Sequence, residues 1–309
     1  MTRYLGLDLG GTNIKAVVLE LDAGTAVGVA EDSSATRAER GPLGVVERLV
    51  EVGRQMIERH GPIEAVGLGV PGLFDRASGV IELFPNLPGP WKGQPLRDPV
   101  AESLNRDVTL INDARAFSLA EATMGAGRGC STVACVTLGT GIGGGLVIDG
   151  RLHLGAWGVA GEIGHQTLVV DGPLCGCGNR GCVEALAKAE VLVELAGKAN
   201  AEEVYQAATE GDTASLAAIE TVAGWLGVGL ANVVAILGPD RIVVGGGITA
   251  AGELALEPIR EAVRRRVTLV PVSQIEIVAA ELGTSAGAIG AALAAGRPSA
   301  DRVQADRAR

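Results

Sequence analysis

The sequence predicts an α/β protein built from two related lobes, and three observations point to this architecture. Segments typical of buried strands alternate with segments of helical periodicity along most of the chain. A strand, glycine turn and second strand occur around residues 9–12 and are repeated around residues 138–141. The 309 residues fit two domains of roughly 150 residues each. Two such lobes are expected to hold a ligand in the cleft between them.

In the first half, short apolar runs predict strands and a striped segment predicts a helix. Residues 42–60 carry apolar side chains at helical spacing, with Pro42 at the start and Gly61 after the end. Residues 84–99 contain five prolines and are expected to form a long loop. The expected strands are residues 3–9, 14–21, 26–31, 63–70 and 107–111, and a further helix is expected at 114–124.

The second half continues the alternation. Strands are expected at residues 131–138, 144–148, 241–244 and 275–279, and helices at 183–196, 213–237, 253–267 and 285–295. The first lobe is expected to comprise residues 1–118 and 285–300, and the second to comprise residues 119–284. The polar residues 301–309 are expected to be a disordered tail.

Composition excludes several classes of protein. A hydrophobic share of 47% and a mean hydropathy of +0.31 exclude intrinsic disorder for most of the chain. The net charge of −10 argues against a nucleic-acid partner. No apolar run is expected to reach the ~18–20 residues of a membrane span. The first residues have the pattern of a strand and do not resemble a signal peptide. A cytoplasmic protein without a membrane partner is therefore expected.

The 46 glycines are clustered, and the clusters are candidate ligand sites. Residues 139–144 and 67–72 both match the G-x-G-x-x-G pattern of dinucleotide sites. Neither match is followed by the helix that such a site needs, so this interpretation is rejected. A glycine turn between two strands is a different phosphate-binding device, because backbone N–H groups can approach the ligand without an intervening Cβ.

The first such turn follows Asp8. Gly10 and Gly11 are expected to present N–H groups to a phosphate, and Thr12 a hydroxyl. The Asp8 carboxylate could hold Mg²⁺ directly or through water. A single glycine-rich turn of this kind is more often an ordinary hairpin. The sequence contains three such turns, each at the end of an expected strand, and together they favour nucleotide binding.

The other two turns lie in the second half. Gly139, Thr140 and Gly141 are expected to bind phosphate from the second lobe. Gly245 and Gly246, after an expected strand, would let a flat adenine lie against the backbone.

Four motifs in this order resemble the ROK family of sugar kinases. They are DLGGTNIK (residues 8–15), LGTGIGGG (138–145), EIGH (162–165) and CGCGNRGC (175–182). The resemblance spans Leu5 to about Gly290 and implies the two-lobed hexokinase/actin-like (ribonuclease H-like) ATPase fold. It also implies that Asn13 and Lys15 belong to the ATP site.

The catalytic base implied by the resemblance is Asp113, where a strand is expected to end and a helix to begin. On sequence alone an Asp at this place is more often a helix cap. As a base, the carboxylate would accept the proton of a sugar hydroxyl, whose oxygen attacks the γ-phosphorus. The neighbouring Asn112 is a candidate partner for sugar hydroxyls.

The sugar-binding residues implied by the resemblance are Glu162, His165 and Glu184. Gly72, in a Pro-Gly turn, and Asn86, in the proline-rich loop, are further candidates. Without the resemblance, Glu162 could equally belong to a surface turn.

A metal site is predicted by His165, Cys175, Cys177 and Cys182, since three thiolates and one imidazole suit tetrahedral Zn²⁺. In a reducing compartment such a cluster favours metal over a disulfide. Four protein ligands close the coordination sphere, so the zinc is expected to be structural and to pin the sugar-binding loop. The second nitrogen of His165 would remain for the sugar.

The resemblance implies ATP-dependent phosphorylation of a hexose at its 6-hydroxyl, with glucose as the expected substrate. Other ROK substrates remain open, namely N-acetylmannosamine, fructose, mannose or allose, as does polyphosphate as a donor. A non-catalytic sugar sensor is the alternative class; ROK repressors carry an N-terminal helix-turn-helix, for which no room is expected before Asp8. The family also implies a homodimer or homotetramer.

Overall fold

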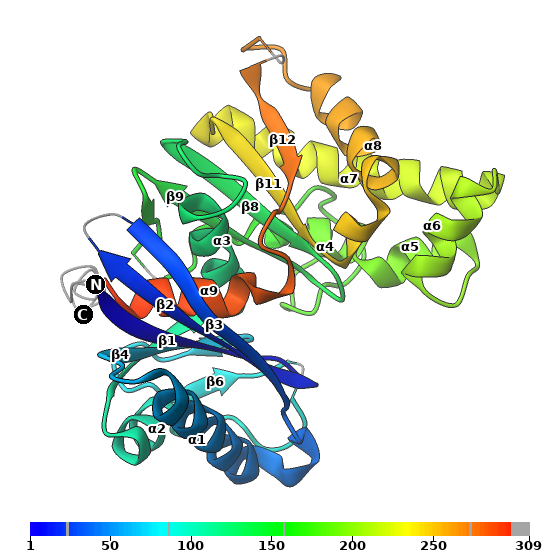
Figure 1. The fold of residues 1–309 in the computed structure, drawn as a ribbon. Coiled ribbons are helices and arrows are strands. Elements are labelled where there is room, and N and C mark those ends of the chain that lie inside the picture. The colour runs from blue at the N-terminus through cyan, green and yellow to red at the C-terminus, as the bar shows by residue number, and fades with distance from the viewer. Residues whose placement is uncertain (23–24, 86, 157, 272–273, 298–309) are drawn as a thin grey trace. The chain divides into compact units, whose positions relative to one another are not determined.

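The computed structural model describes residues 1–22, 25–85, 87–156, 158–271 and 274–297, and its chain divides into two compact units (Figure 1). Unit 1 comprises Met1–Ala120, Gly155–Gly158 and the segment that begins at Thr284. Unit 2 comprises Glu121–Leu154 and Val159–Gly283. Each unit has a five-stranded mixed sheet, so the predicted α/β class is confirmed. Asn86 and the tail 301–309, about which expectations were stated, lie outside the described residues.

The sheet of unit 1 has the strand order β3-β2-β1-β4-β7. Its strands are β1 (Thr2–Leu9), β2 (Asn13–Asp22), β3 (Thr25–Ala35), β4 (Ala65–Val70) and β7 (Asp107–Asn112). Strands β1, β4 and β7 are parallel, with Asp8 opposite Gly69 and Val70 opposite Asn112. The carboxyl ends of β1 and β7, which carry Asp8 and Asn112, therefore lie at the same edge of this sheet.

Helices cover both faces of this sheet (Figure 1). Helices α1 (Gly41–His60) and α2 (Arg97–Leu104) bury aliphatic side chains against one face. Helix α9 (Ala286–Ala295) lies on the other face, where two strand glycines allow a close approach. A Cβ atom on Gly6 would lie 1.8 Å from the Ala288 carbonyl oxygen, and one on Gly67 would lie 1.8 Å from that of Ala291.

Unit 2 contains the second sheet, in the order β10-β9-β8-β11-β12. Its strands are β8 (Thr132–Leu138), β9 (Ile142–Ile148), β10 (Arg151–Leu152), β11 (Arg241–Gly246) and β12 (Glu276–Ala279). Its helices are α4 (Val183–Ala187), α5 (Ala189–Ala196), α6 (Ala201–Thr209), α7 (Thr213–Leu237) and α8 (Glu253–Arg264). Helix α3 (Asp113–Thr123) begins in unit 1 and ends in unit 2.

Helix α7 is 25 residues long, and its most apolar stretch has a mean hydropathy of 1.6. By length and composition it could span a membrane, so the expectation that no apolar run is long enough was wrong. However, 56% of that stretch is buried inside the protein. Leu226, Leu230 and Val234 of α7 belong to the hydrophobic core of unit 2. The helix is apolar because it is the central helix of this core.

Several elements differ from the sequence expectation. Helix α2 begins inside the expected proline-rich loop, because Pro99 stands in its first turn, where a missing N–H costs nothing. The single helix expected at 183–196 is two helices, separated by the extended residue Lys188. Helix α6 and several short elements, both strands and 3-10 helices, were not predicted from the sequence. The short elements are β5 (Leu73–Phe74), β6 (Ile81–Leu83), η1 (Ala38–Arg40), η2 (Ile163–His165), η3 (Gly247–Ala251) and η5 (Gly283–Ser285).

Candidate active site and metal centre

The turn after Asp8 is a closed hairpin between β1 and β2. The Gly10 N–H donates to the Asn13 carbonyl oxygen at 3.0 Å, so this N–H closes the turn and does not face outward as expected. Thr36 supports the turn from the side. Its hydroxyl donates to the Gly10 carbonyl oxygen at 2.7 Å, and its N–H donates to the Thr12 carbonyl oxygen at 2.8 Å. Gly11 and Thr12 are exposed at the tip of the turn.

Asp8 is half-buried and lies in an electrostatically unfavourable place. Burial raises the pKa of its carboxyl from the ordinary value to about 7, and the nearby charge of Asp113 adds to this, while Lys15 opposes it. The first turn of α9 packs directly on the carboxylate, since a Cβ on Gly287 would lie 2.4 Å from Asp8 Oδ2. A cation at this place would relieve the desolvation and the repulsion together, which suits the expected Mg²⁺ ligand.

Lys15 and Asn13 follow Asp8 on β2. The Lys15 ammonium donates to the Thr284 carbonyl oxygen at 2.7 Å. This contact ties β2 to the segment before α9. Asn13 opens β2 opposite Ala35, and its side chain lies in an exposed position beside the turn.

Asp113 is the first residue of α3, directly after β7. Its Oδ1 accepts the Ala114 N–H at 2.8 Å, which orients the half-buried carboxylate. Asn112 has a supporting role in the structure. Its Oδ1 accepts the Arg115 N–H at 3.3 Å, and its Nδ2 donates to the Gly72 carbonyl oxygen at 3.2 Å. The structure therefore brings Gly72, Asn112 and Asp113 together in unit 1.

The second glycine turn joins β8 to β9 in unit 2. The Gly139 N–H donates to the Gly141 carbonyl oxygen at 3.0 Å, and Thr140 is exposed at the tip. Gly245 and Gly246 pair with Thr137 and Leu138 on the neighbouring parallel strand, so both glycine segments leave the sheet at one edge.

Gly246 has a structural reason to be glycine that sequence reasoning did not give. It has a φ of 91°, in the left-handed region, and a Cβ there would lie 2.2 Å from the Leu138 carbonyl oxygen. Close backbone packing of β11 on β8 thus requires this glycine with or without adenine.

The four predicted metal ligands form one cluster. The ligand atoms of His165, Cys175, Cys177 and Cys182 all lie within 4.8 Å of one another. His165 Nδ1 is 3.6 Å from Cys175 Sγ, and Cys177 Sγ is 3.8 Å from Cys182 Sγ. A tetrahedral zinc with bonds of about 2.3 Å to sulfur and about 2.0 Å to nitrogen requires separations of about 3.8 Å and about 3.6 Å. The donor set therefore fits Zn²⁺, and these two separations agree with a tetrahedral site.

The thiols of this cluster have unequal pKa values without a metal. Burial raises the pKa of Cys175 to about 12 and also raises that of Cys182. The backbone N–H of Asn179 lowers the pKa of Cys177. Metal binding must displace the protons of the Cys175 and Cys182 thiols, so metal affinity is expected to fall as the pH falls.

The two ring nitrogens of His165 face different partners. Nδ1 faces Cys175, and Nε2 lies 4.0 Å from Glu162 Oε2. Glu184 is placed differently: its Oε2 accepts the Ile142 N–H at 2.8 Å, and its Oε1 accepts from the Cys175 thiol at 3.4 Å. Glu162, His165 and Glu184 thus lie around the metal cluster and the end of the second glycine turn, all within unit 2.

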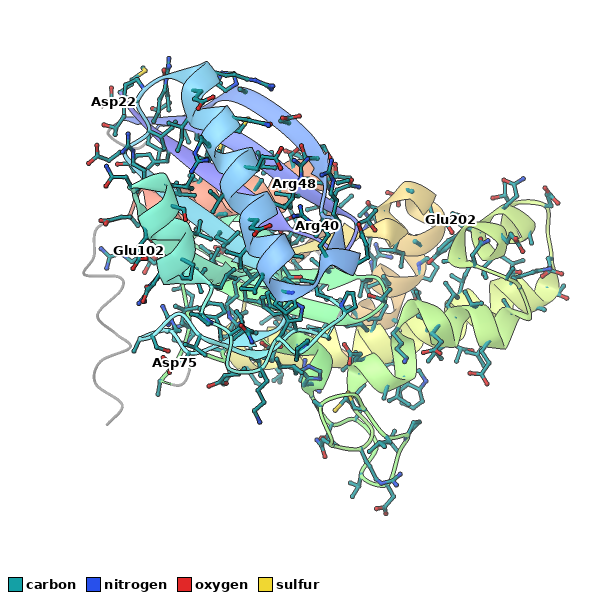
Figure 2. The ribbon with its side chains drawn as sticks, turned by 90° about the horizontal axis from the view of Figure 1, so that it is seen from below. Asp22, Arg40, Arg48, Asp75, Glu102 and Glu202 are labelled. Atoms are coloured by element: carbon teal, nitrogen blue, oxygen red, sulfur yellow. The ribbon has the colours of Figure 1, made fainter. Side chains whose placement is uncertain are left out.

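Three supporting residues were missed by sequence reasoning. Thr36 is fully buried beneath the first turn, and no motif surrounds it. Arg48 of α1 (labelled in Figure 2) holds the same segment by donating to the Ala35 carbonyl oxygen at 3.1 Å. Glu121 is fully buried near the end of α3, and its carboxylate accepts the N–H groups of Ala126 and Leu282 at 3.0 and 2.9 Å. A lone acidic residue among small apolar ones was the available signal for Glu121.

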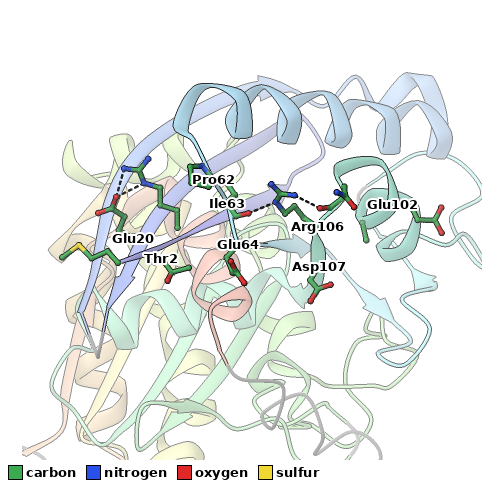
Figure 3. A pocket seen from close by; sticks show the side chains of 12 residues that line it. Thr2, Glu20, Pro62, Ile63, Glu64, Glu102, Arg106 and Asp107 are labelled. Atoms are coloured by element: carbon green, nitrogen blue, oxygen red, sulfur yellow. Dashed lines mark hydrogen bonds and ion pairs between the residues drawn. The ribbon is translucent and has the colours of Figure 1, made fainter.

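A pocket of about 930 Å³ lies at the opposite edge of the unit 1 sheet (Figure 3). Its two arginines already have partners. Arg3 pairs with Glu20 at 2.7 Å, and Arg106 donates to the Ile63 carbonyl oxygen at 2.6 Å. The pocket lies at the amino ends of β1, β4 and β7, whereas Asp8 and Asn112 mark their carboxyl ends. It is therefore separate from the candidate active site.

Comparisons with known proteins agree with these motifs. Residues 4–297 match the ROK family. The chain is 37% identical to a glucokinase of Thermotoga maritima, covering 94% of this chain and 96% of that one. It superposes with a TM-score of 0.79 on a ROK family glucokinase from Streptomyces griseus, solved in complex with glucose and AMPPNP, at 34% identity and over 95% and 99% of the two chains.

A relative of another functional class also matches. A xylose repressor of Caldicellulosiruptor bescii is 34% identical over 74% of this chain and 61% of the repressor. Family membership alone therefore does not separate kinases from regulators. The match along nearly the whole sequence confirms the family that the four motifs implied: the chain belongs to the ROK family.

Proposed function

We propose that the protein is an ATP-dependent hexokinase that converts glucose to glucose 6-phosphate. The observation that carries this proposal is the pair of carboxylates at one edge of the unit 1 sheet. Asp8, with a pKa raised to about 7, suits a Mg²⁺ ligand, and Asp113, whose charge reaches Asp8, suits a base. The glucokinase relatives, one of them solved with glucose and AMPPNP, support the choice of substrate and donor.

In this mechanism Asp113 accepts the proton of the glucose 6-hydroxyl, and the hydroxyl oxygen attacks the γ-phosphorus of ATP. The bond between the γ-phosphorus and the β,γ-bridging oxygen breaks, and ADP leaves with that oxygen. The Ala114 N–H donates to Asp113 Oδ1, and this hydrogen bond orients the carboxylate of the proposed base. Asp8 would hold Mg²⁺, which supplies neutralisation of the phosphate charge when bound. Gly11 and Thr12 are the proposed phosphate-binding groups of unit 1. Thr140 and Gly141 are the proposed phosphate-binding groups of unit 2.

The sugar would be held by hydrogen-bonding groups of different charge. Glu162, His165 and Glu184 are proposed to bind the pyranose hydroxyls, with Asn112 and the Gly72 turn on the side of the base. Asn112 already donates to the Gly72 carbonyl oxygen, so its part is to keep this turn in place. Zn²⁺ on His165, Cys175, Cys177 and Cys182 would be structural, because four protein ligands leave no open position.

The cellular setting follows as part of the proposal. A cytoplasmic location supplies ATP and keeps the metal-binding thiols reduced. A homodimer or homotetramer is proposed on the basis of the family. A sugar-responsive regulator is the second candidate function, and the xylose repressor among the relatives is the observation that favours it.

A panel of sugars measured with a coupled ATP assay tests the proposal. Glucose, mannose, fructose, allose and N-acetylmannosamine should be compared at equal concentrations, with polyphosphate as an alternative donor. We expect turnover with ATP and the highest kcat/KM for glucose. Binding of glucose without consumption of ATP or polyphosphate would contradict the enzyme and favour the regulator.

A further inference from the structure

We propose that helix α4 is a brace that couples metal binding to the shape of the second glycine turn, so that zinc loading sets nucleotide affinity. The inference rests on the proposed function, which identifies that turn as a phosphate-binding element. It assigns a second role to the segment that carries His165, Cys175, Cys177 and Cys182, besides positioning the proposed sugar-binding side chains.

The amino end of α4 is fixed by the metal cluster. Cys182 is fully buried and directly precedes α4, so its Sγ and the first turn of the helix cannot move independently. Two residues later, Glu184 accepts the N–H of Ile142, the residue that ends the glycine turn and begins β9. The distance of 2.8 Å is that of a strong hydrogen bond to a charged acceptor.

The carboxyl end of α4 holds the other side of the same turn. The chain is extended at Lys188, and the next N–H, that of Ala189, donates to the Gly139 carbonyl oxygen at 3.0 Å. Gly139 and Ile142 bracket the turn, so the segment from Glu184 in α4 to Ala189, the first residue of α5, is hydrogen-bonded to both of its ends. The first glycine turn is supported by Thr36, whose hydroxyl donates to the Gly10 carbonyl oxygen. The second glycine turn is instead supported by the segment that follows Cys182, one of the predicted metal ligands.

A third contact reinforces this connection. The loop that carries His165 packs on the same turn, because a Cβ on Gly164 would lie 2.1 Å from the Ile142 carbonyl oxygen. Val183 of α4 is buried beside Gly229 of α7, where a Cβ would lie 2.9 Å from a Val183 methyl group. Helix α4 thus packs on the core of unit 2. A displacement of Cys182 would therefore be transmitted through α4 to the second glycine turn.

Linkage gives a test that does not depend on catalysis. If zinc strengthens nucleotide binding by some factor, the nucleotide must strengthen zinc binding by the same factor. Zinc affinity should be measured by competition with a chromophoric chelator, with and without saturating MgADP. For the wild type we expect MgADP to tighten zinc binding by about 5-fold to 20-fold, within the range typical of coupled sites.

Two variants disconnect the brace in different ways. Ala189→Pro removes the N–H that reaches Gly139, at the first position of α5, where proline is tolerated and Lys188 already has a compatible ψ of 162°. Ala185→Gly softens α4 without touching either hydrogen bond. In both variants, the factor by which MgADP tightens zinc binding should fall towards one. Ala201→Pro, at the first position of α6, is the matched control and should keep the full effect.

The outcomes separate the inference from the proposed function. If MgADP binds the wild type but leaves zinc affinity unchanged, the brace is overturned and the kinase proposal stands. An unchanged MgADP effect in Ala185→Gly and Ala189→Pro also overturns the brace. If MgADP does not bind at all, the proposed function and the inference both fail.

Discussion

The two glycine turns of this protein have the same local form but different supports. In each, the N–H of the first glycine closes the turn, at 3.0 Å to Asn13 in unit 1 and at 3.0 Å to Gly141 in unit 2. The first turn follows the half-buried Asp8 and is supported by Thr36. The second is gripped by the helix that follows Cys182.

The difference suggests a division of labour between the units. Unit 1 contributes carboxylates that are proposed to take part in the chemistry, so changes to Asp113 should lower kcat. Unit 2 contributes a turn and hydrogen-bonding side chains that surround the His165 and cysteine cluster, so changes there should raise KM. The predictions below, from the largest expected effect to the smallest, can break or sharpen this division.

Asp113→Asn should lower kcat by about 10³-fold and leave glucose binding nearly unchanged, since it removes the base but keeps the shape. Steady-state kinetics and calorimetric glucose binding measure the two effects. Asp75→Asn is the matched control, because Asp75 is an exposed acid of unit 1 (Figure 2). A kcat within a few-fold of the wild type would exclude Asp113 as the base.

Cys177→Ser should release zinc and raise the KM for glucose by about 10-fold to 100-fold, because the loop that carries His165 loses its anchor. Metal content and KM should be measured on the same preparation. Cys130→Ser removes a thiol outside the cluster and should change neither quantity. A zinc-free Cys177→Ser protein with wild-type KM would refute the structural role of the metal.

The pH dependence of Mg²⁺-nucleotide binding should report Asp8. Its pKa of about 7 means that the carboxyl is protonated below this pH in the ligand-free protein, so affinity should fall up to about tenfold per pH unit there. Asp8→Asn should abolish this dependence together with Mg²⁺-dependent binding. A wild-type affinity that stays constant from pH 8 to pH 5.5 would contradict the assignment.

Asp8 also gives a stability prediction with a definite sign. Its folded pKa is raised, so the wild type loses stability as the pH rises from about 4 to about 7 through this group. Asp8→Asn should therefore match the wild type near pH 4 and exceed its free energy of unfolding above pH 7. Denaturant titrations at both pH values measure this difference.

Thr36→Val should have the smallest effect. It leaves the Gly10 carbonyl without its hydroxyl donor inside the protein and should cost about 1–3 kcal/mol of unfolding free energy. The KM for ATP should rise several-fold, while Thr36→Ser, which keeps the hydroxyl, should behave like the wild type. Equal stability of the valine and serine variants would show that Thr36 does not support the turn.

The sequence was informative where one short segment contains the whole feature. The metal cluster, the glycine turns and the start of α3 at Asp113 could be predicted because spacing and residue type suffice. Thr36 could not be found, since its partner Gly10 is 26 residues away and only the sheet brings them together. The bonds of Lys15 to Thr284 and of Ala189 to Gly139 depend on tertiary packing in the same way.

The central claim is that this chain transfers phosphate from ATP to glucose, and product analysis tests it most directly. The purified protein should be incubated with ATP, Mg²⁺ and glucose and followed by ³¹P NMR. We predict glucose 6-phosphate and ADP in equal amounts, with little ADP when glucose is omitted. Unchanged ATP in a protein that binds glucose would contradict the account.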